Sequence, residues 1–111
     1  MPTTSKFRKR PNYQVLTFGK KYKTYDDFYD ENKPIIYKSI INIFKEFKKS
    51  RKKILTLQLN AIIEGIDWET QLNFNKDEYI VLKRDLMPYF ESVEDYEICG
   101  EINNLYKEFT N

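Results

Sequence analysis

The side chains that most often carry chemistry in proteins are scarce in this sequence. Histidine is absent, and Cys99 is the only cysteine. Histidine is the commonest general base and metal ligand, so a zinc site here would need carboxylates alone, which is uncommon. No base stands near Cys99 in the sequence to activate its thiol, so we expect a buried structural residue. A single cysteine allows no intramolecular disulfide, which fits a reducing compartment.

Motifs of the large enzyme classes are also missing. The sequence has no phosphate-binding loop, no glycine-rich dinucleotide turn, no nucleophile elbow and no metal-binding box. Carboxylates are plentiful, but a sequence does not show which of them meet in space, so a small carboxylate-dependent hydrolase stays as the weakest alternative. We therefore predict a protein that is not an enzyme, with no catalytic residue, no cofactor and no metal ligand.

Lysine and arginine are the polar residues that cluster. Residues 1–63 hold 15 of the 19 basic residues and five of the 17 acidic residues, for a formal net charge of +10, whereas residues 64–111 carry −8. Such an asymmetry indicates a partner with a matching field. The candidate polyanion-binding residues are Lys6, Arg8, Lys9, Arg10, Lys20, Lys21, Lys23, Lys48, Lys49, Arg51, Lys52 and Lys53.

These basic segments allow two interpretations. Cations interleaved with aromatic residues are what binding to a nucleic-acid backbone and to unpaired bases requires. Alternatively, lysines at a helix C-terminus serve the helix dipole, and the two oppositely charged halves neutralise each other within the fold. The acidic residues of the last predicted helix likewise form either a solvated face or a docking surface for a basic partner; they are Glu94, Glu97, Glu101 and Glu108.

The elements that position these residues are organised around a β-hairpin at about 53–74. Apolar residues alternate with polar ones on both sides of Gly65, which is typical of two half-buried strands and a tight turn. If paired residue numbers sum to 129, Ala61 faces Trp68, Leu57 faces Leu72, and the large apolar side chains share one face. We expect Trp68 in the core. Helices must cover this face, because a lone hairpin is not stable in water.

Two helices are predicted before the hairpin. Thr24 has the capping-box spacing for a short helix that ends near Asn32. Pro34 then suits a first helical residue, and the apolar spacing that follows predicts a second helix to about Lys49. Residues Tyr13–Phe18 form a candidate third strand.

Two more helices are predicted after the hairpin. Asn75 is the expected cap of the first, and Pro88 predicts its end or a kink at Met87. The second restarts at Ser92 by the capping spacing. Gly100 lies inside it at a cost of about 1 kcal/mol, unless another backbone packs against the glycine.

The expected organisation is a basic flexible tail at 1–12 and one α+β domain at 13–111. That domain is a small antiparallel sheet, built on the hairpin and packed against about four helices. No stretch approaches the ~20 apolar residues of a membrane span. The first ten residues do not resemble a secretory signal, so the predicted location is the cytoplasm of the producing or host cell, with a virion as the alternative.

The function that these features favour is that of a small non-enzymatic accessory protein. It would dock on a larger protein or nucleoprotein assembly, without membrane contact. The abundance of Lys, Ile, Tyr and Asn is typical of AT-rich genomes, such as those of many phages and some bacteria. The alternative is direct nucleic-acid binding through the basic N-terminal half.

Overall fold

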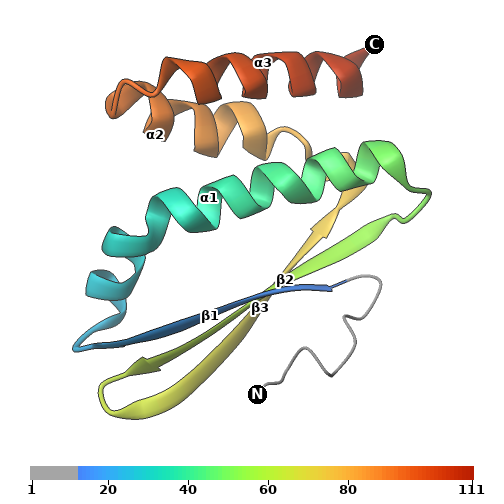
Figure 1. Ribbon diagram of the computed structural model, residues 1–111. Helices are drawn as coiled ribbons and strands as arrows, with labels where there is room; N and C mark the ends of the chain where they lie inside the picture. The colour runs from blue at the N-terminus through green and yellow to red at the C-terminus, as the bar shows by residue number, and fades with distance from the viewer. Residues whose placement is uncertain (1–12) are drawn as a thin grey trace.

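The computed structural model describes residues 13–111, so the predicted tail at 1–12 lies outside the described residues (Figure 1). Eight elements follow one another along the chain. They are β1 (Tyr13–Tyr22), α1 (Tyr25–Lys49), β2 (Ile54–Ile63), β3 (Ile66–Asn75), a 3₁₀ turn η1 (Lys76–Glu78), a π-helical segment η2 (Leu82–Leu86), α2 (Met87–Ser92) and α3 (Tyr96–Thr110).

The predicted hairpin is confirmed, with the predicted register. Strands β2 and β3 are antiparallel; Ala61 lies opposite Trp68 and Leu57 lies opposite Leu72. Glu64 and Gly65 form the turn with φ angles of 56° and 75°. Two consecutive positive φ angles are the requirement of a two-residue hairpin turn whose twist matches the strands.

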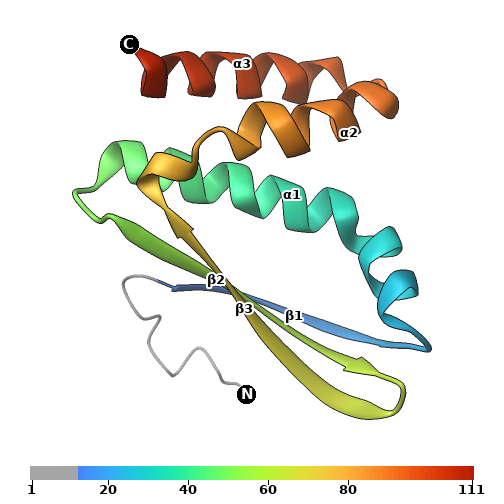
Figure 2. The same ribbon diagram turned by 180° about the vertical axis from the view of Figure 1, so that it is seen from behind.

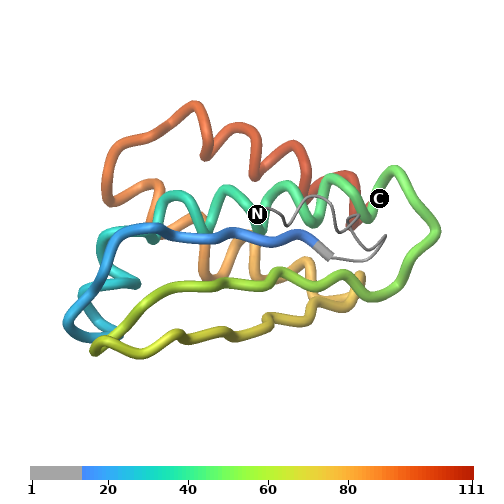
Figure 3. Tube along the Cα trace, turned by 60° about the horizontal axis from the view of Figure 1, so that its bottom comes forward, coloured from blue at the N-terminus to red at the C-terminus, as the bar shows by residue number. Residues whose placement is uncertain are grey.

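The predicted antiparallel sheet is wrong in one respect, because the sheet is mixed. The strand order is β1-β2-β3, and β1 runs parallel to β2 (Figure 3). Leu16 lies opposite Leu59. The candidate strand at Tyr13–Phe18 therefore joins the sheet and extends to Tyr22. The reason for the parallel pairing is the connection: α1 returns the chain to the end of the sheet where β1 began.

The two helices predicted before the hairpin are one continuous helix. Thr24 caps α1 as expected, since its Oγ1 accepts a hydrogen bond of 3.0 Å from the Asp27 N–H. Pro34 lies inside α1 rather than at the start of a new helix. The first turns of α1 stand at an angle to the rest (Figure 1), as is usual around a proline. The helix continues because apolar side chains on both sides of Pro34, such as Phe28 and Ile36, are buried in one core.

The segment after the hairpin also differs from the prediction. Asn75 begins only the short turn η1, where its N–H donates to Glu78 Oε1 at 2.7 Å. The helix does not end at Met87 as predicted: the π-helical winding of η2 changes there to α2, which carries Pro88 in its first turn, where a missing N–H is tolerated. Asp95, not Ser92, caps α3, and its Oδ1 accepts from the Ile98 N–H at 3.3 Å. The described residues thus form three α-helices, where about four were predicted.

The core lies between the sheet and the helices. Helix α1 crosses one face of the sheet, and α2 and α3 lie beyond it (Figures 1 and 2). Leu57, Leu59, Phe44 and Phe47 are fully enclosed between these layers. Trp68 was expected in this core but is only half-buried, because β3 is an edge strand.

Candidate polyanion-binding site

The candidate cations form two groups at opposite ends of α1. The first group lies where β1 ends and α1 begins, and consists of Lys20, Lys21 and Lys23. The second group, at 48–53, spans the end of α1 and the loop to β2. A helix of 25 residues is about 37 Å long at ~1.5 Å per residue. The structure therefore does not bring these two groups together. The remaining candidates, Lys6, Arg8, Lys9 and Arg10, lie outside the described residues.

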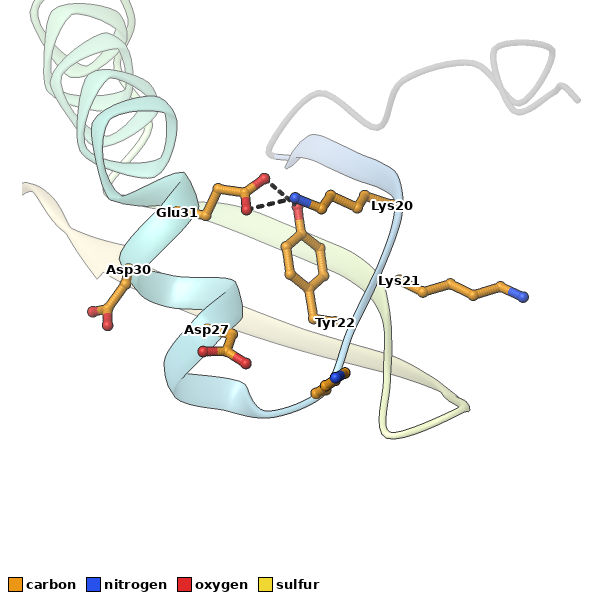
Figure 4. A pocket seen from close by; sticks show the side chains of 7 residues that line it. Lys20, Lys21, Tyr22, Asp27, Asp30 and Glu31 are labelled. Carbon is orange, nitrogen blue, oxygen red and sulfur yellow. Dashed lines mark hydrogen bonds and ion pairs between the residues drawn. The ribbon is translucent and has the colours of Figure 1, made fainter.

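The first group lines a shallow pocket of mixed charge (Figure 4). Its three lysines share the pocket with Tyr22 and three carboxylates, those of Asp27, Asp30 and Glu31. Equal numbers of cations and anions leave no net positive field for a polyanion.

Lys20 is engaged within this pocket by Glu31. Its Nζ lies 2.7 Å from Glu31 Oε1, and the hydrogen bond and charge of Glu31 raise the pKa of Lys20. Lys21 instead points away from the carboxylates (Figure 4). Both side chains of the ion pair are about half exposed, so the pair adds little stability.

A buried hydrogen-bond network holds the pocket in shape. Asn32, with 5% of its surface exposed, donates through Nδ2 to Tyr22 Oη at 3.0 Å and to the Phe28 carbonyl at 2.9 Å. The first of these bonds links the end of β1 to α1, and the second lies within the first turns of α1. The role that the contacts support for Tyr22 and Asn32 is structural, since buried polar groups require partners.

Two cations at the far end of α1 serve the packing of α3. Lys48 Nζ donates to the Glu108 carbonyl at 3.0 Å and lies 5.0 Å from the centre of the Phe109 ring. It thereby satisfies a carbonyl in the last turn of α3 and complements the helix dipole. Lys45, one turn earlier in α1, forms an ion pair with Glu101. Part of the lysine run is thus explained by neutralisation within the fold.

Three other cations at this end are exposed and unpaired. Lys49, Arg51 and Lys53 have no ion pair or side-chain hydrogen bond with any residue in 13–111. We call these three residues the basic end. Lys52, between them, is half-buried and has an interaction partner, so it is not included.

The loop after Lys49, which carries Arg51 and Lys53, is held at both sides. The Ser50 N–H donates to the Glu46 carbonyl at 3.0 Å, and Ser50 Oγ accepts from the Lys52 N–H at 3.3 Å. On the other side, the Lys53 carbonyl accepts from the Lys76 N–H at 2.9 Å. Lys76 is therefore a neighbour of the basic end that we did not select from the sequence. The hairpin register could have identified it, because 53 and 76 also sum to 129.

Within residues 13–111, the aromatic residues interleaved with the cations do not form a stacking surface. Tyr22, Phe44 and Phe47 are buried in the core, with at most 7% of their surface exposed. Bases that stack on protein need accessible rings. The described cations are accordingly suited to contacts with phosphates or carboxylates, rather than to stacking with these rings.

The four acidic residues predicted for the last helix lie in α3 or in the turn before it. Glu97, Glu101 and Glu108 are exposed on α3, while Glu94 lies in the turn before it with a φ of 59°. Of these four side chains, Glu101 is the one held in an ion pair. Nowhere in residues 13–111 do three or more acidic or thiol side chains come together as metal ligands would.

None of the helices in the described part combines the length and apolar character needed to cross a bilayer.

Comparison of the chain with known proteins finds no relative. No protein-family model matches the sequence, and neither the curated proteins nor the solved structures contain a significant match.

Proposed function

We propose that the protein is a non-enzymatic accessory protein that docks through its basic end on an acidic surface of a larger protein or nucleoprotein assembly. The observation that supports this proposal is the exposure of Lys49 at the end of α1, and of Arg51 and Lys53 on the following loop, which is held by main-chain hydrogen bonds. Cations that serve the fold, such as Lys48, are engaged, whereas these three have no described partner.

The point at which residues 1–12 join the described chain gives further support. Tyr13 lies opposite Thr56, which is only three residues after Lys53. Chain connectivity therefore attaches Lys6, Arg8, Lys9 and Arg10 to the same end of the sheet. Two basic segments that are separated by about 40 residues in the sequence start from neighbouring points, so one acidic surface could engage both.

The test compares two triple variants with the same change of charge. The first replaces Lys49, Arg51 and Lys53 by Gln, and the matched control replaces Lys21, Lys23 and Lys38, which are also exposed. Binding to poly-glutamate and to a single-stranded oligonucleotide is measured over a salt series. We expect the first variant to lose at least tenfold in affinity for poly-glutamate, and the control to lose less than threefold.

Deletion of residues 1–10 is tested in the same series, alone and combined with the first variant. The deletion should leave the circular dichroism spectrum and melting temperature unchanged and should weaken binding further. Equal losses in both triple variants, or no loss in either, would contradict docking through the basic end.

The salt series separates this proposal from direct nucleic-acid binding. If the three cations contact phosphates, their removal should lower the slope of log affinity against log salt for the oligonucleotide by about 2–3. Capture from the native source with wild-type protein, followed by nuclease treatment, adds a second readout. Loss of every captured protein on nuclease treatment, together with preference for the oligonucleotide, would favour direct nucleic-acid binding instead.

A further inference from the structure

An exposed apolar patch lies beside the hairpin turn. Ile66 has 66% of its surface exposed and Tyr25 has 44%. Both adjoin Trp68: Ile66 precedes it by two positions on the same face of β3, and the Tyr25 ring lies 5.5 Å from the Trp68 ring, centre to centre. We call Tyr25, Ile66 and Trp68 the hairpin patch. Tryptophan and tyrosine are among the residues that most often dominate the binding energy of protein interfaces.

Trp68 has no polar partner in the described chain. Its ring is half-buried against Tyr25, Phe28 and Tyr29, yet no residue in 13–111 accepts a hydrogen bond from its Nε1. The indole N–H of a tryptophan that becomes buried usually has an acceptor. This donor is therefore available to a group that covers the hairpin patch.

The hairpin patch is bordered by exposed carboxylates. The Glu64 N–H donates to the Tyr22 carbonyl at 2.9 Å, which holds the hairpin turn against the chain that leads into α1. The exposed carboxylates of these two segments form no ion pair with any residue in 13–111; they are Asp26, Asp27, Asp30, Glu64, Asp67 and Glu69. They outnumber the exposed and unpaired lysines nearby, Lys21 and Lys23, so the patch has a negative border.

The basic end has the opposite charge and an exposed apolar residue of its own. Ile54, which follows Lys53, has 52% of its surface exposed. Across the hairpin, Ile54 lies opposite Asn75, the neighbour of Lys76 in the chain. Each end of the sheet thus combines exposed apolar surface with charge, negative at the hairpin patch and positive at the basic end. Such surfaces are complementary, since an apolar centre with a charged border is typical of protein interfaces.

We propose that the hairpin patch binds the basic end of a second copy of the chain, so that copies associate head to tail. This inference rests on the proposed function, because it uses the same basic end and identifies one acidic surface that it binds. Ile54 of one copy packs against Tyr25 and Ile66 of the next, and the cations of the basic end face the carboxylate border. A second copy is favoured over another partner because the chain itself carries both complementary surfaces.

The two surfaces lie too far apart for one molecule to bind its own patch. Strand β2 begins beside the basic end and runs for 10 residues to the hairpin turn, which is about 33 Å at ~3.3 Å per residue. Figures 1 and 2 show the start of β2 and the hairpin turn at opposite ends of the sheet. Because two different surfaces meet, each added copy leaves one surface of each kind free until a ring closes.

The first experiment measures the mass of the full chain by light scattering over a series of protein and salt concentrations. We expect the mass of the wild type to rise above that of one chain with concentration, and to fall at high salt because exposed charges are screened. Ile66→Lys places a cation in the hairpin patch and should weaken association at least about tenfold, and Asp26→Asn combined with Asp67→Asn should also weaken it. Val93→Lys is the matched control, since Val93 is also about half exposed but lies between α2 and α3. It should associate as the wild type does.

The second experiment mixes two variants that each retain one of the two surfaces. Ile66→Lys keeps the basic end, whereas the triple Gln variant of Lys49, Arg51 and Lys53 keeps the hairpin patch. Each variant alone should remain a monomer with the circular dichroism spectrum of the wild type. An equimolar mixture should form a dimer and nothing larger, because its two remaining surfaces are both defective.

Binding to poly-glutamate separates this inference from the proposed function. Ile66→Lys should bind poly-glutamate as the wild type does, because its basic end is intact. A wild type that stays monomeric at all concentrations but binds poly-glutamate through the basic end would overturn head-to-tail association and leave the proposed function standing. Equal effects of Ile66→Lys and Val93→Lys, or no dimer in the mixture, would also overturn it.

Discussion

Lys45 in α1 and Glu101 in α3 form an ion pair, with 3.0 Å between Nζ and Oε1. The pair joins the positively charged N-terminal half of the chain to the negatively charged C-terminal half. One turn further along α1, Lys48 donates to the Glu108 carbonyl. The contrast in charge between the two halves is therefore used in part to hold α3 against α1.

We expect the Lys45–Glu101 pair to contribute less than about 1 kcal/mol, because exposed ion pairs are weakened by solvent. The side chains of both residues are more than 40% exposed. A double-mutant cycle with Lys45→Gln and Glu101→Gln, measured by urea unfolding, gives the coupling energy, which should fall at high salt. A coupling well above this value, or one independent of salt, would contradict the expectation.

Gly100→Ala should stabilise the protein by about 0.5–1 kcal/mol. The glycine lies inside α3, and a Cβ added there would meet no atom within 4 Å. The close backbone contact that could have explained this glycine is therefore absent within the described chain, and alanine would gain only in helix propensity. The measurement is the free energy of unfolding in urea. A loss of stability in the monomer would contradict this account of α3.

Gly65→Ala is the matched control for this prediction. Gly65 also has open space around it, but its φ is 75°. An L-residue in this left-handed region costs about 1–2 kcal/mol, so the same substitution should destabilise here. If both variants changed stability in the same direction, backbone conformation would not be the deciding factor.

Leu57→Ala should destabilise the fold more than Trp68→Ala does. Leu57 is fully enclosed, and truncation of such a residue costs about 2–5 kcal/mol. Trp68 is half-buried against Tyr25, Phe28 and Tyr29, so we expect its truncation to cost about 1.5–3 kcal/mol. Urea unfolding midpoints compare the two. A larger loss for Trp68→Ala would mean that its ring is more enclosed than the described contacts indicate.

Cys99 should react slowly with iodoacetamide in the folded protein. Burial raises the pKa of its thiol, and only the thiolate is nucleophilic. The difference in reaction rate between the folded and the urea-unfolded protein should widen as the pH rises to about 8.5, where an unperturbed thiol ionises. Equal rates in the folded and unfolded protein would contradict the burial of Cys99.

The same pKa shift predicts a dependence of stability on pH. Because the pKa of the thiol is higher in the folded state than in the unfolded state, the protonated thiol contributes to the stability of the fold. This contribution is fully present at pH values below the pKa of the thiol in the unfolded state. It is lost as the pH rises toward the folded pKa. The wild type should therefore lose more stability than Cys99→Ala between pH 7 and pH 10. Parallel loss in the two proteins would indicate that the thiol titrates equally in both states.

The sequence by itself determined the hairpin and the start of α1. The alternation around Gly65 set the pairing of Ala61 with Trp68, because a slip by one residue would turn every apolar side chain to the other face. Thr24 set the first turn of α1 through its Oγ1, which accepts a hydrogen bond from the Asp27 N–H. These features depend on neighbours within a few residues, or on one repeated pattern, and such relationships are visible in a sequence.

Only the tertiary structure decided the direction of β1, the passage of α1 through Pro34, and the use of each cation. A strand pattern does not specify whether its neighbour is parallel, and the burial of Phe28 and Ile36 on either side of Pro34 is a long-range effect. Lys48 and Lys49 are adjacent in the sequence, yet one bonds to α3 and the other is free of described partners. Their roles differ because helix periodicity turns neighbouring side chains to different surroundings, which only the packed fold defines.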